Sequence, residues 1–104
     1  MVATYLHVVI DTYRDDATRD VHTGVDSKAA RRFGGAVRTV ARRKLDLIGA
    51  AADIRDLKVP PGNRLEKLRG DLAGFYSIRV NEQFRIIFRF DAGNASDVQI
   101  TDYH

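Results

Sequence analysis

The feature that most constrains the fold is the turn sequence Pro60-Pro61-Gly62-Asn63, because the spacing of apolar residues changes there. Proline cannot continue a helix or a central strand, and glycine next to it favours a turn. Before this turn, apolar residues recur at the 3.6-residue spacing of a helix; after it, they alternate with a period of two. The sequence therefore predicts mainly helices in the first half and strands in the second.

Three elements are predicted at the start of the chain. The aromatic and β-branched residues of Tyr5–Ile10 predict a strand. A short helix capped by Asp11 or Thr12 is expected to run to about His22, with acidic residues in its first turn. Ser27 is expected to cap a second helical piece, which the following pair of glycines would end.

A longer helix is predicted from Ala36 to about Ala51, with a further turn over Asp53–Leu57. Its apolar residues form one stripe, and basic residues occupy the other side. The stripe consists of Val37, Val40, Ala41, Leu45 and Ile48. The basic side is part of a block over residues 27–44 that contains no acid: Lys28, Arg31, Arg32, Arg38, Arg42, Arg43 and Lys44. Such a block is either a solvated helix face or a surface for a polyanion.

Four strands are predicted after the turn, at Leu65–Arg69, Phe75–Val80, Phe84–Phe90 and Asp97–Thr101. Loops are expected at Gly70–Gly74, Asn81–Gln83 and Asp91–Ser96. A three-residue turn at Asn81–Gln83 is preferred, because a two-residue turn would slip the pairing by one residue and mix apolar and arginine side chains on each face.

This turn places Tyr76 opposite Phe88 and sorts the hairpin into two faces. One face is apolar and is expected to pack against the helices: Tyr76, Ile78, Val80, Phe84, Ile86, Phe88 and Phe90. The other face carries Arg79, Arg85 and Arg89, with Phe75, Ser77 and Ile87, and is expected to stay open. We predict a single α+β domain over residues 1–104, in the order β-α-α-β-β-β-β, with an antiparallel-rich sheet.

Composition excludes several classes of site. The chain has no cysteine and three scattered histidines, so no metal or other cofactor is expected. The apolar run Leu6–Ile10 is too short for a signal segment or a membrane span. Together with the absence of cysteine, this fits a cytoplasmic protein without a membrane partner.

The chain ends in Asp102-Tyr103-His104, an acid, a phenol and an imidazole directly after a predicted strand. These side chains are suited to proton transfer at neutral pH, and the arginine face lies in the same sheet. Cleavage of RNA without a metal needs a base, an acid and cations that stabilise the phosphate. The alternative is a solvated tail that carries a histidine by chance.

The run VPPGNRLEKLRGDLAGFYSIRVNEQFRIIFRF, followed by DVQITDYH, resembles the HigB group of the RelE/ParE toxin superfamily, of the plasmid maintenance system killer type. The resemblance is dense over residues 57–104 and fair over the basic helix, whereas residues 1–24 depart from the usual shorter start. It implies a RelE-like fold and a ribosome-dependent mRNA endonuclease that acts as the toxin of a type II toxin–antitoxin system.

The resemblance also implies roles for individual residues. Asp102, Tyr103 and His104 match the catalytic end of the family, and Arg85 matches its phosphate-stabilising arginine. Glu66 falls where some relatives have a histidine, so it either acts as a base or orients the site. Arg69 matches a basic position that contacts RNA. From the charge pattern itself, Lys67, Arg79 and Arg89 are expected to bind RNA or phosphate with it, and Arg38, Arg42, Arg43 and Lys44 of the basic helix are expected to dock on the ribosome.

The expected partners are the ribosome with its mRNA and a helix-turn-helix (HigA-like) antitoxin, through which the complex would bind promoter DNA. Two alternatives remain from the sequence. A ParE-like toxin would inhibit a DNA topoisomerase by binding it, although such proteins generally lack the Asp-Tyr-His ending. A degenerate member would act only as an RNA-binding or co-repressor protein.

Overall fold

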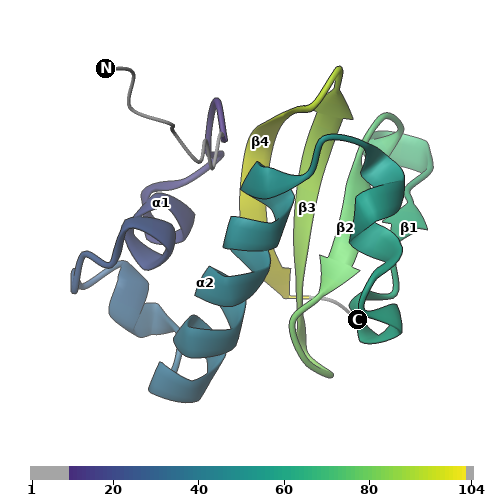
Figure 1. Ribbon diagram of the computed structural model, residues 1–104. Coiled ribbons are helices and arrows are strands. Elements are labelled where there is room, and N and C mark those ends of the chain that lie inside the picture. Colours follow the sequence, from purple (N-terminus) through teal and green to yellow (C-terminus); the bar gives the residue numbers. More distant parts are fainter. Residues whose placement is uncertain (1–9, 103–104) are drawn as a thin grey trace, which may run out of the picture.

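The computed structural model describes residues 10–102 and divides them as the proline-rich turn predicts (Figure 1). Two helices come first and pack against one face of a sheet that the second half of the chain forms. The helices are α1 (Asp16–Thr23) and α2 (Gly35–Ala50), joined by the 3-10 turn η1 (Ala30–Arg32). The strands are β1 (Glu66–Lys67), β2 (Tyr76–Arg79), β3 (Phe84–Asp91) and β4 (Asn94–Asp102).

The sheet has the order β1-β2-β3-β4, and all neighbouring strands are antiparallel. The predicted register of the central hairpin is confirmed, since Tyr76 lies opposite Phe88. Val80 N donates to Phe84 O at 2.9 Å, which leaves Asn81–Gln83 as the loop. The side-chain oxygen of Asn81 accepts from the backbone N–H of Gln83 and of Phe84 at 2.8 and 2.7 Å, so asparagine organises this turn.

The core confirms the predicted apolar faces. The α2 residues Ala41, Leu45 and Ile48 are fully buried against the sheet. The sheet residues that meet them include Ile78, Ile86, Phe88, Val98 and Ile100. Burying one such side chain stabilises the fold by roughly 1.5–3 kcal/mol, so this contact supplies much of the free energy of folding.

The second hairpin differs from the prediction. The expected loop at Asp91–Ser96 is wrong, because a two-residue turn at Ala92-Gly93 joins β3 to β4. Both residues have positive φ, 50° and 82°, as the tight hairpin turns that match strand twist require. Strand β4 therefore starts earlier than Asp97, and it contains a bulge at Asp97, whose φ is 51°.

The start of the described chain also differs. The predicted helix start at Asp11 or Thr12 is wrong, since Asp15 caps α1 by accepting from Thr18 N at 2.8 Å. Residues 10–14 instead run parallel to β4, with Asp11 N donating to Ala95 O at 2.8 Å. Of the predicted strand Tyr5–Ile10, Ile10 forms a parallel bridge to Ala95, and the rest lies outside the described residues.

Two other elements are shorter than predicted. The piece after Ser27 is only the turn η1, and Ser27 Oγ accepts from Ala30 N at 3.0 Å. The strand expected at Leu65–Arg69 keeps only Glu66–Lys67, because another 3-10 turn, η4 (Gly70–Leu72), follows closely. The turn expected at Asp53–Leu57 is present as η2 (Ile54–Lys58), with Asp53 as its cap.

A series of hydrogen bonds joins residues 10–14, the first segment, to both helices. The hydroxyl of Tyr13 lies 2.6 Å from His22 Nδ1 at the end of α1, and His22 Nε2 lies 2.8 Å from the Asp46 carboxylate on α2. Burial, together with the negative charge of Asp46, raises the pKa of Tyr13. His22 is therefore held by a hydrogen-bond partner at each ring nitrogen.

The turn before the sheet is held by Asn63, which is fully buried in η3 (Pro61–Asn63). Its Nδ2 donates to Leu57 O and Val59 O at 3.2 and 3.3 Å, and its Oδ1 accepts from Lys44 on α2. These contacts fix the turn to η2 and α2, so Asn63 positions the residue that follows it, Arg64.

Replacing Asn63 by alanine should destabilise the fold by about 2–4 kcal/mol, because two backbone carbonyls and Lys44 lose their partner. Urea unfolding followed by circular dichroism measures this change. Asn94→Ala is the matched control, since Asn94 is exposed, and it should stay within about 0.5 kcal/mol of the parent. Equal stability of the two variants would contradict the role given to Asn63.

Candidate functional site

The candidate site is a cavity of about 230 Å³ between the end of η3 and the β2–β3 hairpin. Three of its lining residues are arginines, so it presents a concentrated positive charge. The lining residues are Arg64, Arg79, Asn81, Glu82 and Arg85. Guanidinium groups match phosphate oxygens in a planar, two-pronged geometry, which makes this cavity suited to an anion of that kind.

The arginines meet because of register and turn geometry. Arg79 and Arg85 are direct partners in the β2–β3 ladder, so their side chains leave the same face of the sheet. Arg64 follows η3 in a left-handed conformation, with φ 47°, and its carbonyl accepts from Arg85 Nη2 at 2.7 Å. Arg79 Nε donates to Asn81 O at 3.1 Å. Backbone carbonyls thus hold two of the three guanidinium groups in place.

Arg85 is the most buried of these arginines, with only 7% of the residue exposed. Its Nη2 lies 3.5 Å from the Glu66 carboxylate, whose side chain is 52% exposed. A charge held out of water needs such partners, and it interacts more strongly with an anion there than on an open surface.

Glu66 brings a proton acceptor to the same face. It lies opposite Ser77 in the β1–β2 ladder, and Ser77 lies on the face of Arg79 and Arg85. The structure therefore brings Glu66 and Arg85, two of the predicted site residues, together on one face of the sheet. A carboxylate beside a guanidinium-lined cavity can accept a proton from a hydroxyl that lies next to a bound phosphate.

Of the three predicted C-terminal site residues, the structure describes only Asp102. Asp102 lies opposite Phe84, whereas the ladder partner of Arg85 is Thr101, so alternation puts Asp102 on the face opposite to Arg85. There the Asp102 carboxylate accepts from Gln83 Nε2 at 3.1 Å and borders a cavity that includes Phe33 and Phe84. Tyr103 and His104 lie outside the described residues.

Arg89 does not join the cavity. It lies four residues beyond Arg85 on β3, about 13 Å away at the rise of a strand. Its guanidinium sits 4.4 Å from the centre of the Phe75 ring and 3.3 Å from the Asp97 carboxylate. Arg14, from the first segment, also lies over Phe75 at 5.4 Å, a contact that strand patterning could not reveal.

The expectation of an open arginine face is wrong for its middle. Phe75, Ser77 and Ile87 are all buried there, and Arg85 is largely buried as well. Arginine side chains account for part of this burial, because the guanidinium groups of Arg14 and Arg89 lie over the ring of Phe75.

Two other predicted RNA contacts lie elsewhere. Lys67 is opposite Tyr76 and therefore on the other face of the sheet from Glu66. Arg69 is exposed just before η4. Arg64, by contrast, was not among the predicted site residues; the only sequence signal for it is its place directly after the Pro-Pro-Gly-Asn turn.

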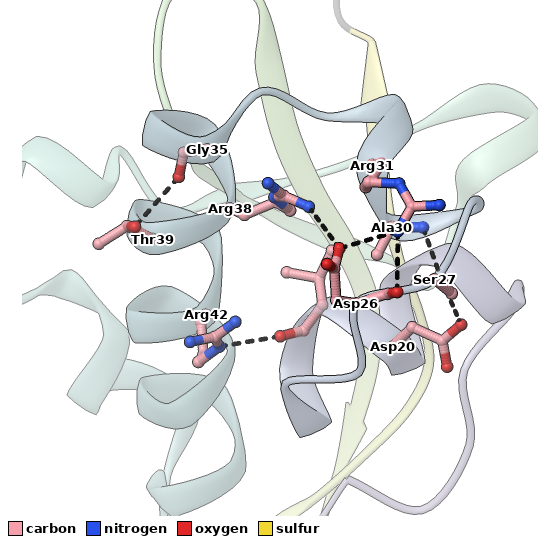
Figure 2. Close-up of polar contacts among 10 residues, drawn as sticks. Asp20, Asp26, Ser27, Ala30, Arg31, Gly35, Arg38, Thr39 and Arg42 are labelled. Atoms are coloured by element: carbon pink, nitrogen blue, oxygen red, sulfur yellow. Dashed lines mark hydrogen bonds and ion pairs between the residues drawn. The ribbon is translucent and has the colours of Figure 1, made fainter.

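The basic residues of α2 line a separate polar region, shown in Figure 2. Arg38 Nη1 lies 3.5 Å from the Asp26 carboxylate, and Arg42 Nε donates to Val21 O at 3.0 Å (Figure 2). Both arginines border a cavity of about 340 Å³ between the end of α1 and the start of α2.

Lys44 and Arg43 differ from each other in their surroundings. Lys44 donates to the buried Asn63, and burial, aided by the positive charge of Arg43, lowers the pKa of Lys44. Arg43 is exposed, and no partner for it is found within residues 10–102. Of the basic residues predicted to dock on the ribosome, Arg43 thus projects most freely from the helix, while Lys44 stabilises the fold.

Two kinds of site are not found within the part of the chain that the structure describes. No group of three or more histidine, cysteine, aspartate or glutamate side chains is arranged there as metal ligands would be. None of the described helices has the length and apolar character needed to span a bilayer.

Sequence comparisons add independent evidence. A family model described as the RelE-like toxin of the type II toxin–antitoxin system HigB matches residues 12–104. The toxin HigB-1 of Vibrio cholerae serotype O1 is 44% identical over 70 residues, which cover 67% of this chain and 74% of that protein. An uncharacterised protein of Haemophilus influenzae is 41% identical over 61 residues, 59% of this chain and 60% of its own length.

Solved structures confirm the fold. A heterotetrameric YoeB–YefM toxin–antitoxin complex from Staphylococcus aureus contains a chain that matches with a TM-score of 0.53 and 16% identity. A second YoeB–YefM structure from the same organism gives a TM-score of 0.55 and 19% identity. Both matches cover 91% of this chain and 97% of the other, so the α+β arrangement of helices and antiparallel sheet is shared throughout.

If the arginine cavity is an anion site, inorganic phosphate should bind there. Titration followed by NMR should shift the guanidinium Nε–H signals of Arg79 and Arg85. Arg85→Gln should weaken this binding at least tenfold, a loss of about 1.4 kcal/mol or more. Arg89→Gln is the matched control, because Arg89 lies at the other end of β3, and phosphate affinity should be unchanged. Loss of binding in the control alone would place the anion site elsewhere.

Proposed function

Since the chain belongs to the HigB-like family of RelE-like toxins from type II toxin–antitoxin systems, we propose that it is a ribosome-dependent endonuclease that cuts mRNA. Such an enzyme stops translation by destroying the message while the ribosome holds it. The observation that carries the proposal is the placement of Glu66 beside the largely buried Arg85, at a cavity lined by three arginines.

The proposed cleavage uses two groups of the RNA backbone, the ribose 2′-hydroxyl and the adjacent phosphate. A base removes the proton of a ribose 2′-hydroxyl, and the resulting oxygen attacks the adjacent phosphorus. Charge builds on the phosphate oxygens and is stabilised by cations, while an acid protonates the departing 5′-oxygen. The 2′-hydroxyl explains why the substrate is RNA rather than DNA.

Residue roles are assigned within that scheme. Arg85, with Arg79 beside it, stabilises the phosphate, and Glu66 is the base because its carboxylate lies 3.5 Å from Arg85 Nη2 on the same face. His104 is the acid. Asp102 lies on the opposite face, which favours an orienting role over direct contact with the 2′-hydroxyl.

The remaining predicted residues act outside the reacting centre. Tyr103 stacks on a base, a contact worth about 1–3 kcal/mol. Lys67, Arg69 and Arg89 lie outside the cavity and are assigned to more distant parts of the RNA strand. Arg38, Arg42 and Arg43 face ribosomal RNA from α2; Arg43 is exposed, whereas Arg38 and Arg42 are held by Asp26 and by Val21 O.

A helix-turn-helix antitoxin is the proposed partner that holds the toxin inactive, and the pair would bind its own promoter DNA. The solved structure of similar fold from Staphylococcus aureus is a YoeB–YefM toxin–antitoxin complex, which supports a toxin–antitoxin pair here. We place the complex in the cytoplasm, where ribosomes and promoter DNA are both present.

Ribosome dependence follows from the small number of cations at the site. Affinity for a nucleic-acid backbone depends on the number of neutralised phosphates, so three arginines bind free RNA weakly. One mRNA incubated with the protein should be cut rapidly on translating ribosomes and slowly without them. Equally rapid cutting of naked RNA would contradict ribosome dependence. Inhibition of DNA supercoiling without RNA cleavage would favour the ParE-like alternative.

Loss of one proton-transfer group should slow the reaction without unfolding the protein. His104→Ala should reduce cleavage on programmed ribosomes by roughly 10²–10⁴-fold. Its stability should change by less than about 0.5 kcal/mol, as for surface substitutions. His7→Ala is the control for loss of a histidine near the other end of the chain. Full activity of a folded His104→Ala protein would remove His104 from the mechanism.

A further inference from the structure

Ser77 is a buried polar residue that neither the fold nor the proposed mechanism uses. It is fully buried in β2, and its hydroxyl makes no hydrogen bond to any residue between positions 10 and 102, the part of the chain that the structure describes. A buried hydroxyl without a partner destabilises a fold, because the group has lost its hydrogen bonds to water. Alanine has nearly the same size and would avoid this cost, so the hydroxyl calls for another explanation.

The neighbours of Ser77 are the proposed reacting groups. In the β1–β2 ladder Ser77 lies directly opposite Glu66, and side chains in such pairs have Cβ atoms about 4.5–5.5 Å apart. In the β2–β3 ladder its partner is Ile87, which puts Arg85 in the diagonal position on the same face. The Ser77 hydroxyl is therefore within reach of the Glu66 carboxylate after rotation of the glutamate side chain.

The contact of Glu66 with Arg85 is a modest one. The two groups are 3.5 Å apart, and the Glu66 side chain is half-exposed, whereas Arg85 is also held by Arg64 O at 2.7 Å. A phosphate that binds Arg85 competes with the Glu66 carboxylate, because both are anions that use the same guanidinium donors. Binding of substrate thus moves the Glu66 carboxylate away from its present partner.

We propose that Ser77 is a positioning residue, whose hydroxyl donates to the Glu66 carboxylate when Arg85 binds the scissile phosphate. The hydrogen bond from Ser77 keeps Glu66 beside the cavity at the moment when its attraction to Arg85 is lost. In the free protein Glu66 neutralises Arg85, and in the complex Ser77 orients Glu66 toward the ribose. This inference rests on the proposed function and assigns Ser77 no contact with RNA.

The first test compares Ser77→Ala with the parent on programmed ribosomes. Removing a hydrogen bond to a charged group at the reaction step should lower kcat roughly ten- to a hundredfold. KM should stay unchanged, because Ser77 does not touch the substrate, and the melting temperature should be equal or higher. Ser77→Thr, which restores the hydroxyl, should recover most of kcat. Ser96→Ala, on β4, is the matched control and should retain full activity.

The second test asks whether Ser77 acts through Glu66. In a Glu66→Gln background, Ser77→Ala should reduce the residual rate by less than twofold, because the carboxylate it positions is gone. Wild-type kcat in Ser77→Ala, or an undiminished effect in the Glu66→Gln background, would overturn the inference. A fall in melting temperature that accounts for the lost activity would also overturn it, since Ser77 would then be structural.

An NMR measurement separates this inference from the proposed function. The probe is an RNA oligonucleotide whose reacting 2′-hydroxyl is replaced by hydrogen, added at high concentration to protein with labelled glutamate. The Glu66 carboxyl signal should shift in the parent and shift differently in Ser77→Ala. Identical shifts in both proteins would overturn the role of Ser77, whereas failure of the parent to cut any mRNA would overturn only the endonuclease assignment.

Discussion

The register of the β2–β3 hairpin is the constraint on which the rest of the structure depends. Asn81 fixes it by accepting two backbone hydrogen bonds across the turn. A slip of β3 by one residue would turn Arg85 toward α2, away from Arg79, and would expose Ile86 and Phe88. The same alternation therefore builds the hydrophobic core on one face and the arginine cavity on the other, so fold and site are specified together.

Forming this site costs folding free energy, because the charged side chain of Arg85 is largely buried. A guanidinium with little contact with water needs hydrogen-bond partners, and the structure supplies the Arg64 carbonyl and the Glu66 carboxylate. The turn held by Asn63 delivers the first partner, and the short strand β1 delivers the second. An arginine fixed in this way interacts strongly with an anion and does not need to reorganise first, which is the property a phosphate-stabilising group requires.

Much of the fold was predictable from the sequence, because apolar periodicity and the proline-rich turn indicate helices, strands and hairpin register. The long helix and the central hairpin followed from them, whereas Glu66 and Arg85 were named as catalytic residues only by the resemblance to the toxin family. The segment beside β4 and the positive-φ residues Ala92 and Asp97 did not, since they depend on tertiary contacts and on backbone conformations that alanine and aspartate seldom adopt. The covered middle of the arginine face was missed because cation–ring contacts have no signature in strand alternation.

The central claim is that Arg85 and Glu66 form the reacting centre on one face of the sheet. The most direct measurement is a structure of the protein on a ribosome whose mRNA carries a 2′-hydrogen at the cut position. We predict that Arg85 contacts the scissile phosphate and that the Glu66 carboxylate lies beside the ribose carbon that normally bears the hydroxyl. A scissile phosphate bound on the opposite face, next to Asp102 and away from Arg85, would contradict the account.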